Sequence, residues 1–191
     1  MAGIREGNKG VLLVVDVQVG VMRNAWDAPR IIKNIANAVE KARSLGVPVI
    51  WVQHSDDELV QDSSDWQWVP ELSPAKSETQ IHKLFNSAFE QTSLEETLAG
   101  LGATHIVLAG AATNWCIRAT AYGALERDYD LTLIKDAHTT ETLELENGVK
   151  IEAANIIREL NIAMTWLSYP GRTNGTAAAA DVDFNLPGGV R

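Results

Sequence analysis

Cys116, the only cysteine in the chain, is the side chain best suited to act as a nucleophile. It follows the apolar segment 105–109 and lies near the start of segment 114–127, which reads as a helix. The first turn of a helix presents unpaired N–H groups and a partial positive charge, which stabilise a thiolate and lower the pKa of the thiol. Cys116 is therefore a candidate nucleophile. The alternative is a small buried hydrophobic residue, the commonest role of a free cysteine.

Two charged residues are candidates for activating such a thiol. Asp16 directly follows the apolar run 11–15. A carboxylate at the end of a buried strand needs a partner, and it can serve as a general base. Lys83 lies in the apolar-flanked stretch 81–89, where a lysine can turn inward to pair with a carboxylate. The alternatives are that Asp16 caps a loop or a helix, and that Lys83 lies on the solvated surface.

The elements that must position these residues follow from hydrophobic patterning. Continuous apolar runs predict buried strands, and apolar residues spaced by three and four predict amphipathic helices. The predicted strands are 11–15, 47–52, 105–109, 131–135 and 162–167. The predicted helices are 31–45, 93–101 with a capping box of Ser93 and Glu96, 114–127 and 145–160. This alternation predicts an α/β fold, a single-domain, Rossmann-like parallel sheet with helices on both faces.

The other segments are a long loop and a tail. Residues 54–80 are polar, contain tryptophans and prolines, and are predicted to form a long loop of the kind that is usually functional. The tail, 169–191, is rich in Gly, Ala and Pro, and we expect it to wrap over the surface or over a neighbouring molecule. The core of the single domain 1–191 then spans about residues 10–168.

A site is expected at one edge of this sheet. Ligands of open parallel sheets bind beyond the carboxyl ends of the strands. Asp16, His54 and the segment 110–116 each follow a predicted strand, so their side chains should meet there. The sequence thus predicts that the candidate nucleophile and the candidate base share that edge.

Composition narrows the classes of function. The 16 Lys and Arg residues against 25 Asp and Glu give a net charge of −9 with no basic cluster, so a nucleic-acid partner is not expected. One cysteine excludes an internal disulfide and a structural zinc site made of several thiolates. The longest apolar run, 11–15, is too short to cross a membrane, and residues 1–10 do not resemble a signal peptide. We therefore expect a cytoplasmic protein.

Four ordered segments resemble the isochorismatase-like hydrolase superfamily, also called the cysteine hydrolases. They are a first strand ending in Asp-x-Gln (11–18), a lysine block (83–89), the nucleophile loop Gly-Ala-Ala-Thr-Asn-Trp-Cys (110–116) and Asp-Ala-His (136–138). The resemblance covers about residues 10–168, and the ordered set is much more specific than any one motif. It implies the isochorismatase-like hydrolase fold.

The resemblance also implies a catalytic triad. Cys116 would be the nucleophile, Asp16 the base that takes its proton, and Lys83 a neighbour that favours the ionised forms. The thiolate would attack a carbonyl carbon, and the backbone N–H groups of Ala112 and Cys116 would hold the oxyanion. A non-proline cis peptide would join Ala111 to Ala112. Asp16 would then protonate the leaving amine, and water would hydrolyse the thioester without a cofactor.

Five residues are expected to contact a small-molecule substrate: Gln18, Trp26, His54, Trp66 and Trp115. Tryptophans can wall a pocket with aromatic surface, and Trp115 is adjacent to the candidate nucleophile. The alternatives are that His54 orders its loop, and that Trp66 and Trp68 pack the long loop onto the core or onto a second subunit.

No metal site is expected. The nicotinamidase branch of the superfamily carries a metal bound by Asp and His just after the second strand. Here that region offers His54, and the next histidine, His82, lies far along the chain beside Lys83. A metal requires a regularly spaced set of imidazoles, so the spacing disfavours a metal and a nicotinamidase.

Three classes of function are therefore weighed. A cysteine-dependent hydrolase of a small amide or carbamoyl compound is favoured. Vinyl-ether hydrolysis of an isochorismate-like acid is disfavoured, because that branch typically lacks the nucleophilic cysteine. A catalytically silent binding protein on this fold is the third possibility, because a fold does not establish turnover. A homodimer or homotetramer is also expected, since oligomers are common for such folds.

Overall fold

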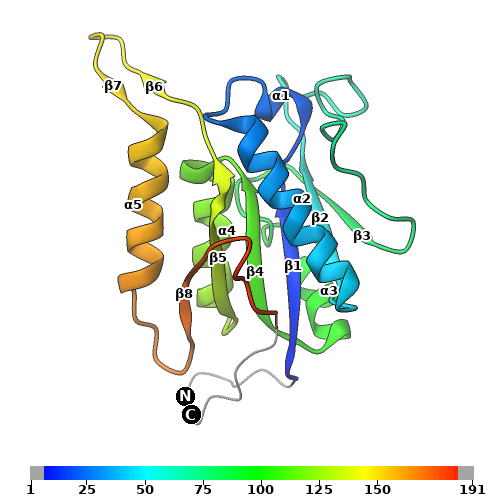
Figure 1. Cartoon of the computed structure of the whole chain (residues 1–191). Coiled ribbons are helices and arrows are strands. Elements are labelled where there is room, and N and C mark those ends of the chain that lie inside the picture. Colours follow the sequence, from blue (N-terminus) through cyan, green and yellow to red (C-terminus); the bar gives the residue numbers. More distant parts are fainter. Residues whose placement is uncertain (1–6, 185–191) are drawn as a thin grey trace.

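A six-stranded sheet forms the centre of the molecule, and all of its paired strands are parallel (Figure 1). The computed structural model describes residues 7–184. The strand order is β3-β2-β1-β4-β5-β8. The strands are β1 (Lys9–Val15), β2 (Val49–His54), β3 (Thr79–Lys83), β4 (Ala103–Ala111), β5 (Asp130–Thr139) and β8 (Asn174–Ala177).

Helices cover both faces of the sheet, as the alternating pattern predicts. Helix α2 (Ala28–Ser44) packs on one face, and α3 (Leu94–Leu101), α4 (Arg118–Glu126) and α5 (Ala153–Trp166) pack on the other. Successive residues of β1 alternate between the two cores, with Leu13 in one and Leu12 in the other. This double burial explains why β1 is apolar at every position from Val11 to Val15.

The strand order reverses between β1 and β4, which makes this pair the topological switch point of the sheet. The two strands approach very closely there, because Val15 is opposite Gly110. Gly110 has φ of 130°, and a Cβ atom at this position would lie 1.9 Å from the carbonyl oxygen of Val15. Glycine is therefore required at 110, and the approach brings the residues after β1 next to those after β4.

Three details of the predicted elements are wrong. Residues 145–152 are not helical. They lie in and beside a short hairpin of β6 (Leu143–Glu144) and β7 (Lys150–Ile151), which turns at Gly148 with φ of 77°. The predicted strand 162–167 is instead the last part of α5, because the helical spacing of buried residues continues through Leu160 and Met164. Ser93 begins α3 without a side-chain capping bond, so the capping box does not form.

Two strands of the six-stranded sheet were not predicted. β3 ends the long loop, and β8 comes from the tail and pairs with β5 at the sheet edge. The tail also buries Val182 and Phe184 against the core beside α2, so it packs over this chain's own sheet. The predicted tail residues 185–191, like residues 1–6, lie outside the described part of the chain. Within residues 7–184, no helix is both long enough and apolar enough to cross a membrane.

Candidate active site

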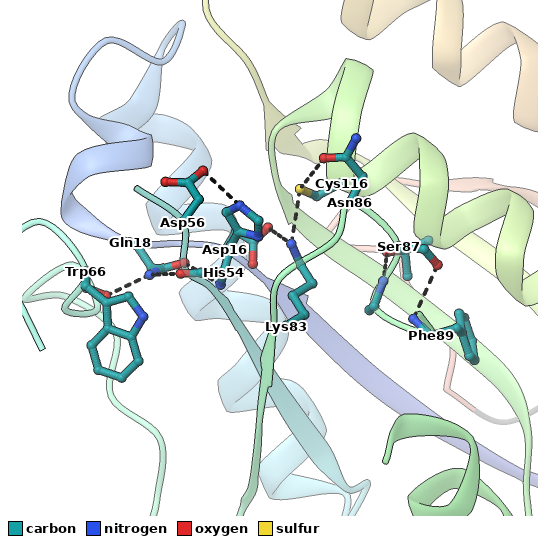
Figure 2. A network of polar contacts seen from close by, with 12 residues as sticks. Asp16, Gln18, His54, Asp56, Trp66, Lys83, Asn86, Ser87, Phe89 and Cys116 are labelled. Carbon is teal, nitrogen blue, oxygen red and sulfur yellow. Dashed lines mark hydrogen bonds and ion pairs between the residues drawn. The ribbon is translucent and has the colours of Figure 1, made fainter. Parts of the chain in front are cut away.

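The side chains of Asp16, Lys83 and Cys116 meet at the switch point (Figure 2). The Nζ of Lys83 lies 2.7 Å from Oδ2 of Asp16 and donates a hydrogen bond to Sγ of Cys116 over 3.2 Å. Asp16 and Lys83 are 1% and 2% exposed, so the ammonium group interacts with these partners out of contact with bulk water. A buried lysine of this kind requires such partners.

Each of the three residues reaches the site from the end of a strand. Asp16 directly follows β1 and adopts a left-handed conformation with φ of 53°, which aspartate tolerates better than most residues. Lys83 is the last residue of β3, and its register partner is His54 at the end of β2. Cys116 lies in a π-helical turn, η1 (Thr113–Ile117), between β4 and α4. The structure therefore brings together all three residues that the resemblance selected.

The thiol of Cys116 does not have the lowered pKa that its place near a helix start predicts. Burial, followed by the negative charge of Asp16, raises its pKa to about 12, while the charge of Lys83 acts in the opposite direction. Burial and the charge of Asp16 therefore favour the neutral thiol over the thiolate.

The carboxyl group of Asp16 also has a raised pKa. Burial is the largest cause, and the neighbouring Lys83 opposes it. A carboxylate with a raised pKa is a stronger base than an exposed one. The charge of Asp16 also acts on the neighbouring thiol of Cys116, and the ammonium group of Lys83 contacts both residues. Asp16 is therefore placed to accept the proton of Cys116 as the sulfur forms a bond.

The chain turns tightly between β4 and Cys116. The peptide bond between Ala111 and Ala112 is cis. The carbonyl oxygen of Ala112 accepts hydrogen bonds from the N–H groups of Trp115 and Ile117, each over 3.1 Å. These bonds fix the turn that joins the end of β4 to Cys116.

Gln18 and Trp66 fasten the long loop to the end of the sheet (Figure 2). The Nε2 of Gln18 donates to the carbonyl oxygens of His54 and Trp66 over 3.0 and 2.8 Å, and its Oε1 accepts the N–H of His54 over 2.9 Å. The ring of Trp66 is 8% exposed and packs edge-on against His82. The amide of Gln18 is thus committed to backbone groups, which supports a positioning role rather than contact with substrate.

The other three residues expected to contact substrate lie in different surroundings. The Nε2 of His54 is 3.0 Å from Oδ2 of Asp56, which ties the histidine to its own loop. Trp115 is 55% exposed next to Cys116, where it is accessible to a ligand. Trp26 lies apart from the triad, beside Arg30 at a cavity of about 470 Å³ between α2 and α5. Within residues 7–184, no three His, Cys, Asp or Glu side chains are grouped to hold a metal.

Two polar residues near the site were not selected from the sequence. The thiol of Cys116 donates to Oδ1 of Asn86 over 3.8 Å (Figure 2). Asn86 belongs to the same sequence block as Lys83, residues 83–89, so this motif could have indicated that Asn86 lies near the site. Thr113 begins the η1 turn, and its hydroxyl contacts His138. The sequence could not have indicated this contact, because Thr113 and His138 come together only when β4 and β5 pair.

Comparison with known proteins supports the fold and the motifs. A family model described as the isochorismatase domain matches residues 10–159. Streptothricin hydrolase of Streptomyces noursei is 28% identical over 145 residues, which cover 72% of this chain and 57% of that protein. Ureidoacrylate amidohydrolase of Caulobacter segnis is 30% identical over 142 residues, which cover 58% of this chain and 59% of that protein. The matches thus span less than two thirds of each relative.

A solved structure shows the same architecture. An isochorismatase from Pseudomonas putida KT2440 superposes with a TM-score of 0.80 and 26% identity, covering 92% of this chain and 90% of that one. The family match extends from β1 into α5 and includes Asp16, Lys83 and Cys116. The chain belongs to the isochorismatase family of hydrolases.

Proposed function

We propose that this chain is a cysteine hydrolase that cleaves the C–N bond of a small, non-peptide amide or carbamoyl compound. The observation that carries the proposal is the position of the Lys83 ammonium group, within 2.7 Å of Asp16 and 3.2 Å of Cys116 in a buried site. A nucleophile, a base and a fixed positive charge in mutual contact are the groups that acyl transfer through a thioester requires.

The first step is attack by sulfur on the carbonyl carbon. Because the pKa of Cys116 is raised, the thiol proton must leave as the S–C bond forms. Asp16 accepts that proton, and its own raised pKa favours the transfer. Lys83 remains hydrogen-bonded to sulfur and stabilises the negative charge that develops there.

The second step releases the amine. The N–H groups of Ala112 and Cys116 are proposed to donate to the oxyanion of the tetrahedral intermediate. When the intermediate collapses, the C–N bond breaks and Asp16 returns its proton to the leaving nitrogen. Water then attacks the thioester, with Asp16 again accepting a proton, and releases the acid and the free thiol. Asp16 takes part in every proton transfer of this cycle, so the proposed cycle requires no cofactor.

The substrate class rests on the relatives. Streptothricin hydrolase and ureidoacrylate amidohydrolase are both similar to this chain, and the name of the latter describes amide hydrolysis. Retention of Cys116 favours thioester chemistry over vinyl-ether hydrolysis. A small carbonyl compound bearing an amide or ureido nitrogen is therefore the proposed substrate class.

An ammonia-release screen tests this proposal. The protein is incubated with small primary amides, N-carbamoyl amino acids and ureido acids, alongside Cys116→Ala and Asp16→Asn. We expect turnover of at least one compound by the wild type, and losses of about a hundredfold or more in both variants. Turnover that persists in Cys116→Ala would contradict the thioester route. Binding without turnover across the panel would support a catalytically silent binding protein.

A further inference from the structure

A chain of three side-chain hydrogen bonds runs from the nucleophile turn to helix α5. The hydroxyl of Thr113 lies 2.9 Å from Nδ1 of His138, and Nε2 of His138 lies 3.0 Å from Oδ1 of Asn161. The Nδ2 of Asn161 donates to the carbonyl oxygen of Lys135 over 3.0 Å. Thr113 and His138 are fully buried, so these contacts replace water for both side chains.

The carbonyl group of Lys135, at the end of this series of hydrogen bonds, fixes which group donates in each of them. The carbonyl oxygen of Lys135 can only accept, so the amide nitrogen of Asn161 faces it and the amide oxygen faces His138. His138 must then donate from Nε2, which leaves Nδ1 as an acceptor for a neutral ring. The hydroxyl of Thr113 is therefore the donor. One tautomer of His138 satisfies all three contacts.

The surroundings keep the imidazole neutral. Burial lowers the pKa of His138 to about 4, against the opposing effects of Asn161 and of the charge on Asp136. The cavity between α2 and α5 brings further charged groups to this region, which are Arg30 on α2, Lys135 on β5 and Arg158 on α5.

The position of Thr113 gives this bond a consequence for chemistry. Thr113 immediately follows Ala112 and lies three residues before Cys116 in the η1 turn, so its position constrains the turn that contains both amides. His138 is itself held firmly, because its register partner in the sheet is Gly110 at the close approach of β4 to β1. The side chain of His138 thus connects the rigid end of the sheet to the turn that bears the nucleophile.

We infer that His138, fixed as its Nε2-protonated tautomer by Asn161, is a positioning residue that orients the backbone amides of the 112–116 turn through Thr113. The inference rests on the proposed function, since those amides are the proposed oxyanion donors. It assigns His138 no contact with substrate. A displacement of such donors by about 1 Å is enough to slow acyl transfer strongly.

Two reactions of the same sulfur separate positioning from general damage. Acyl transfer from p-nitrophenyl acetate forms an S–C bond at Cys116, breaks the ester C–O bond and sends the thiol proton to the released phenol, through an oxyanion. Alkylation by iodoacetamide displaces iodide from a saturated carbon and forms no oxyanion. Thr113→Val removes the hydroxyl and retains the branched shape, whereas Thr113→Ser retains the hydroxyl.

A second buried histidine–threonine pair provides the matched control. The Nε2 of His105 lies 2.9 Å from the hydroxyl of Thr132, in the same sheet but near the amino ends of β4 and β5. Thr132→Val therefore removes an equivalent contact far from the nucleophile turn. It is expected to leave both reactions of Cys116 unchanged.

We expect Thr113→Val to slow acyl transfer by about tenfold or more while alkylation changes by less than about twofold, with Thr113→Ser restoring most of the acyl-transfer rate. Equal slowing of both reactions, or of neither, would overturn the inference. If the wild-type protein is alkylated but transfers no acyl group, the proposed function fails first and the inference falls with it.

The tautomer is tested without any substrate. In ¹⁵N-labelled protein, the assigned ring nitrogens of His138 are expected to show protonated Nε2 and bare Nδ1 from about pH 5 to about pH 8. A proton on Nδ1, or titration near the ordinary histidine value of about 6.5, would contradict the hydrogen-bond directions. This result stands even if Thr113→Val folds poorly.

Discussion

At the residue scale, the ammonium group of Lys83 links the carboxylate and the sulfur of the site. The resemblance of four ordered sequence segments to a known family is enough to select Asp16, Lys83 and Cys116. The pKa of Cys116 cannot be predicted from the sequence in the same way. It depends on burial and on a carboxylate a hundred residues away in sequence. The prediction from the start of a helix considers the local backbone alone, and it gives the wrong direction for the pKa shift of Cys116.

Removing the cation should destabilise the protein as well as inactivate it. Lys83→Met leaves Asp16 buried beside an apolar side chain, and we expect a loss of roughly 3 kcal/mol in the free energy of unfolding. The loss should be smaller at acidic pH, because an already raised carboxyl pKa rises further without Lys83 and the neutral acid tolerates burial. Urea denaturation followed by tryptophan fluorescence measures the effect.

The double variant Lys83→Met with Asp16→Asn is the control for this prediction. It removes both charges, so it should recover much of the lost stability while remaining inactive. A double variant that is less stable than Lys83→Met alone would show that the two charges are not a coupled pair.

At the element scale, the sequence predicts those strands that are buried on both faces and misses those that are not. β1, β2 and β4 contain continuous apolar runs, and β5 contains the buried Leu131, Leu133 and Ile134. In β3, exposed polar residues alternate with the buried Ile81 and Lys83. Because one of the two buried residues is a lysine, the sequence does not show the alternation of apolar and polar residues that is typical of a strand. The end of α5 misleads for the opposite reason, since Ile162 to Leu167 is β-prone locally while tertiary packing keeps it helical.

The amide of Gln18 should help to hold the long loop in place, beside the amide of Gln53 and the backbone bonds that join the loop to the segment after β1. Gln18→Leu removes three hydrogen bonds to the backbone of His54 and Trp66, and we expect faster proteolysis within residues 55–78. Gln67→Leu is the matched control, because the Gln67 side chain is exposed on the same loop. Equal cleavage rates in both variants, measured by limited trypsin or chymotrypsin digestion, would show that Gln18 does not secure the loop.

The close approach of β1 and β4 should depend on Gly110. Gly110→Ala places a methyl group 1.9 Å from the Val15 carbonyl oxygen, so the strands must separate, and we expect a protein that is insoluble or melts far below the wild type. Gly46→Ala is the control, because Gly46 also has positive φ, of 68°, but has nothing within 4 Å of the new methyl group. Similar melting temperatures for the two variants would show that glycine is required at 110 because of its positive φ alone, and not because of the close approach of the strands.

At the scale of the whole molecule, alternating strands and helices predict the fold class but not the strand order. The final edge strand, β8, comes from the tail, whose Gly- and Ala-rich sequence gives no strand signal. Its pairing with β5 is decided by contacts between distant segments. The same holds for the contact of Thr113 with His138, which exists only after β4 and β5 pair.

The outer face of α5 should join two copies of the chain. Trp166 and Ile162 are 81% and 42% exposed, and both line cavities of about 470 and 400 Å³ beside the helix. Large exposed apolar side chains on one face mark a candidate interface, and a two-fold dimer would use this face of both copies. We expect a homodimer or homotetramer by size-exclusion chromatography with light scattering.

Substitutions locate that interface. Trp166→Glu should shift the protein toward monomer, whereas Leu45→Glu, at an exposed position at the end of α2, should leave the assembly unchanged. A wild-type protein that is monomeric at working concentration would contradict the expected oligomer. An oligomer that is unaffected by Trp166→Glu would place the interface elsewhere.

The central claim is that Asp16 controls the proton of Cys116, and the pH dependence of Cys116 alkylation tests it most directly. Iodoacetamide reacts with the thiolate, so the rate rises about tenfold per pH unit until the thiol pKa is reached. We predict that the wild-type rate still rises at about pH 10, whereas Asp16→Asn levels off at lower pH because the carboxylate that raises the thiol pKa is gone. Identical profiles that both level off near the ordinary thiol pKa of about 8.5 would contradict the account.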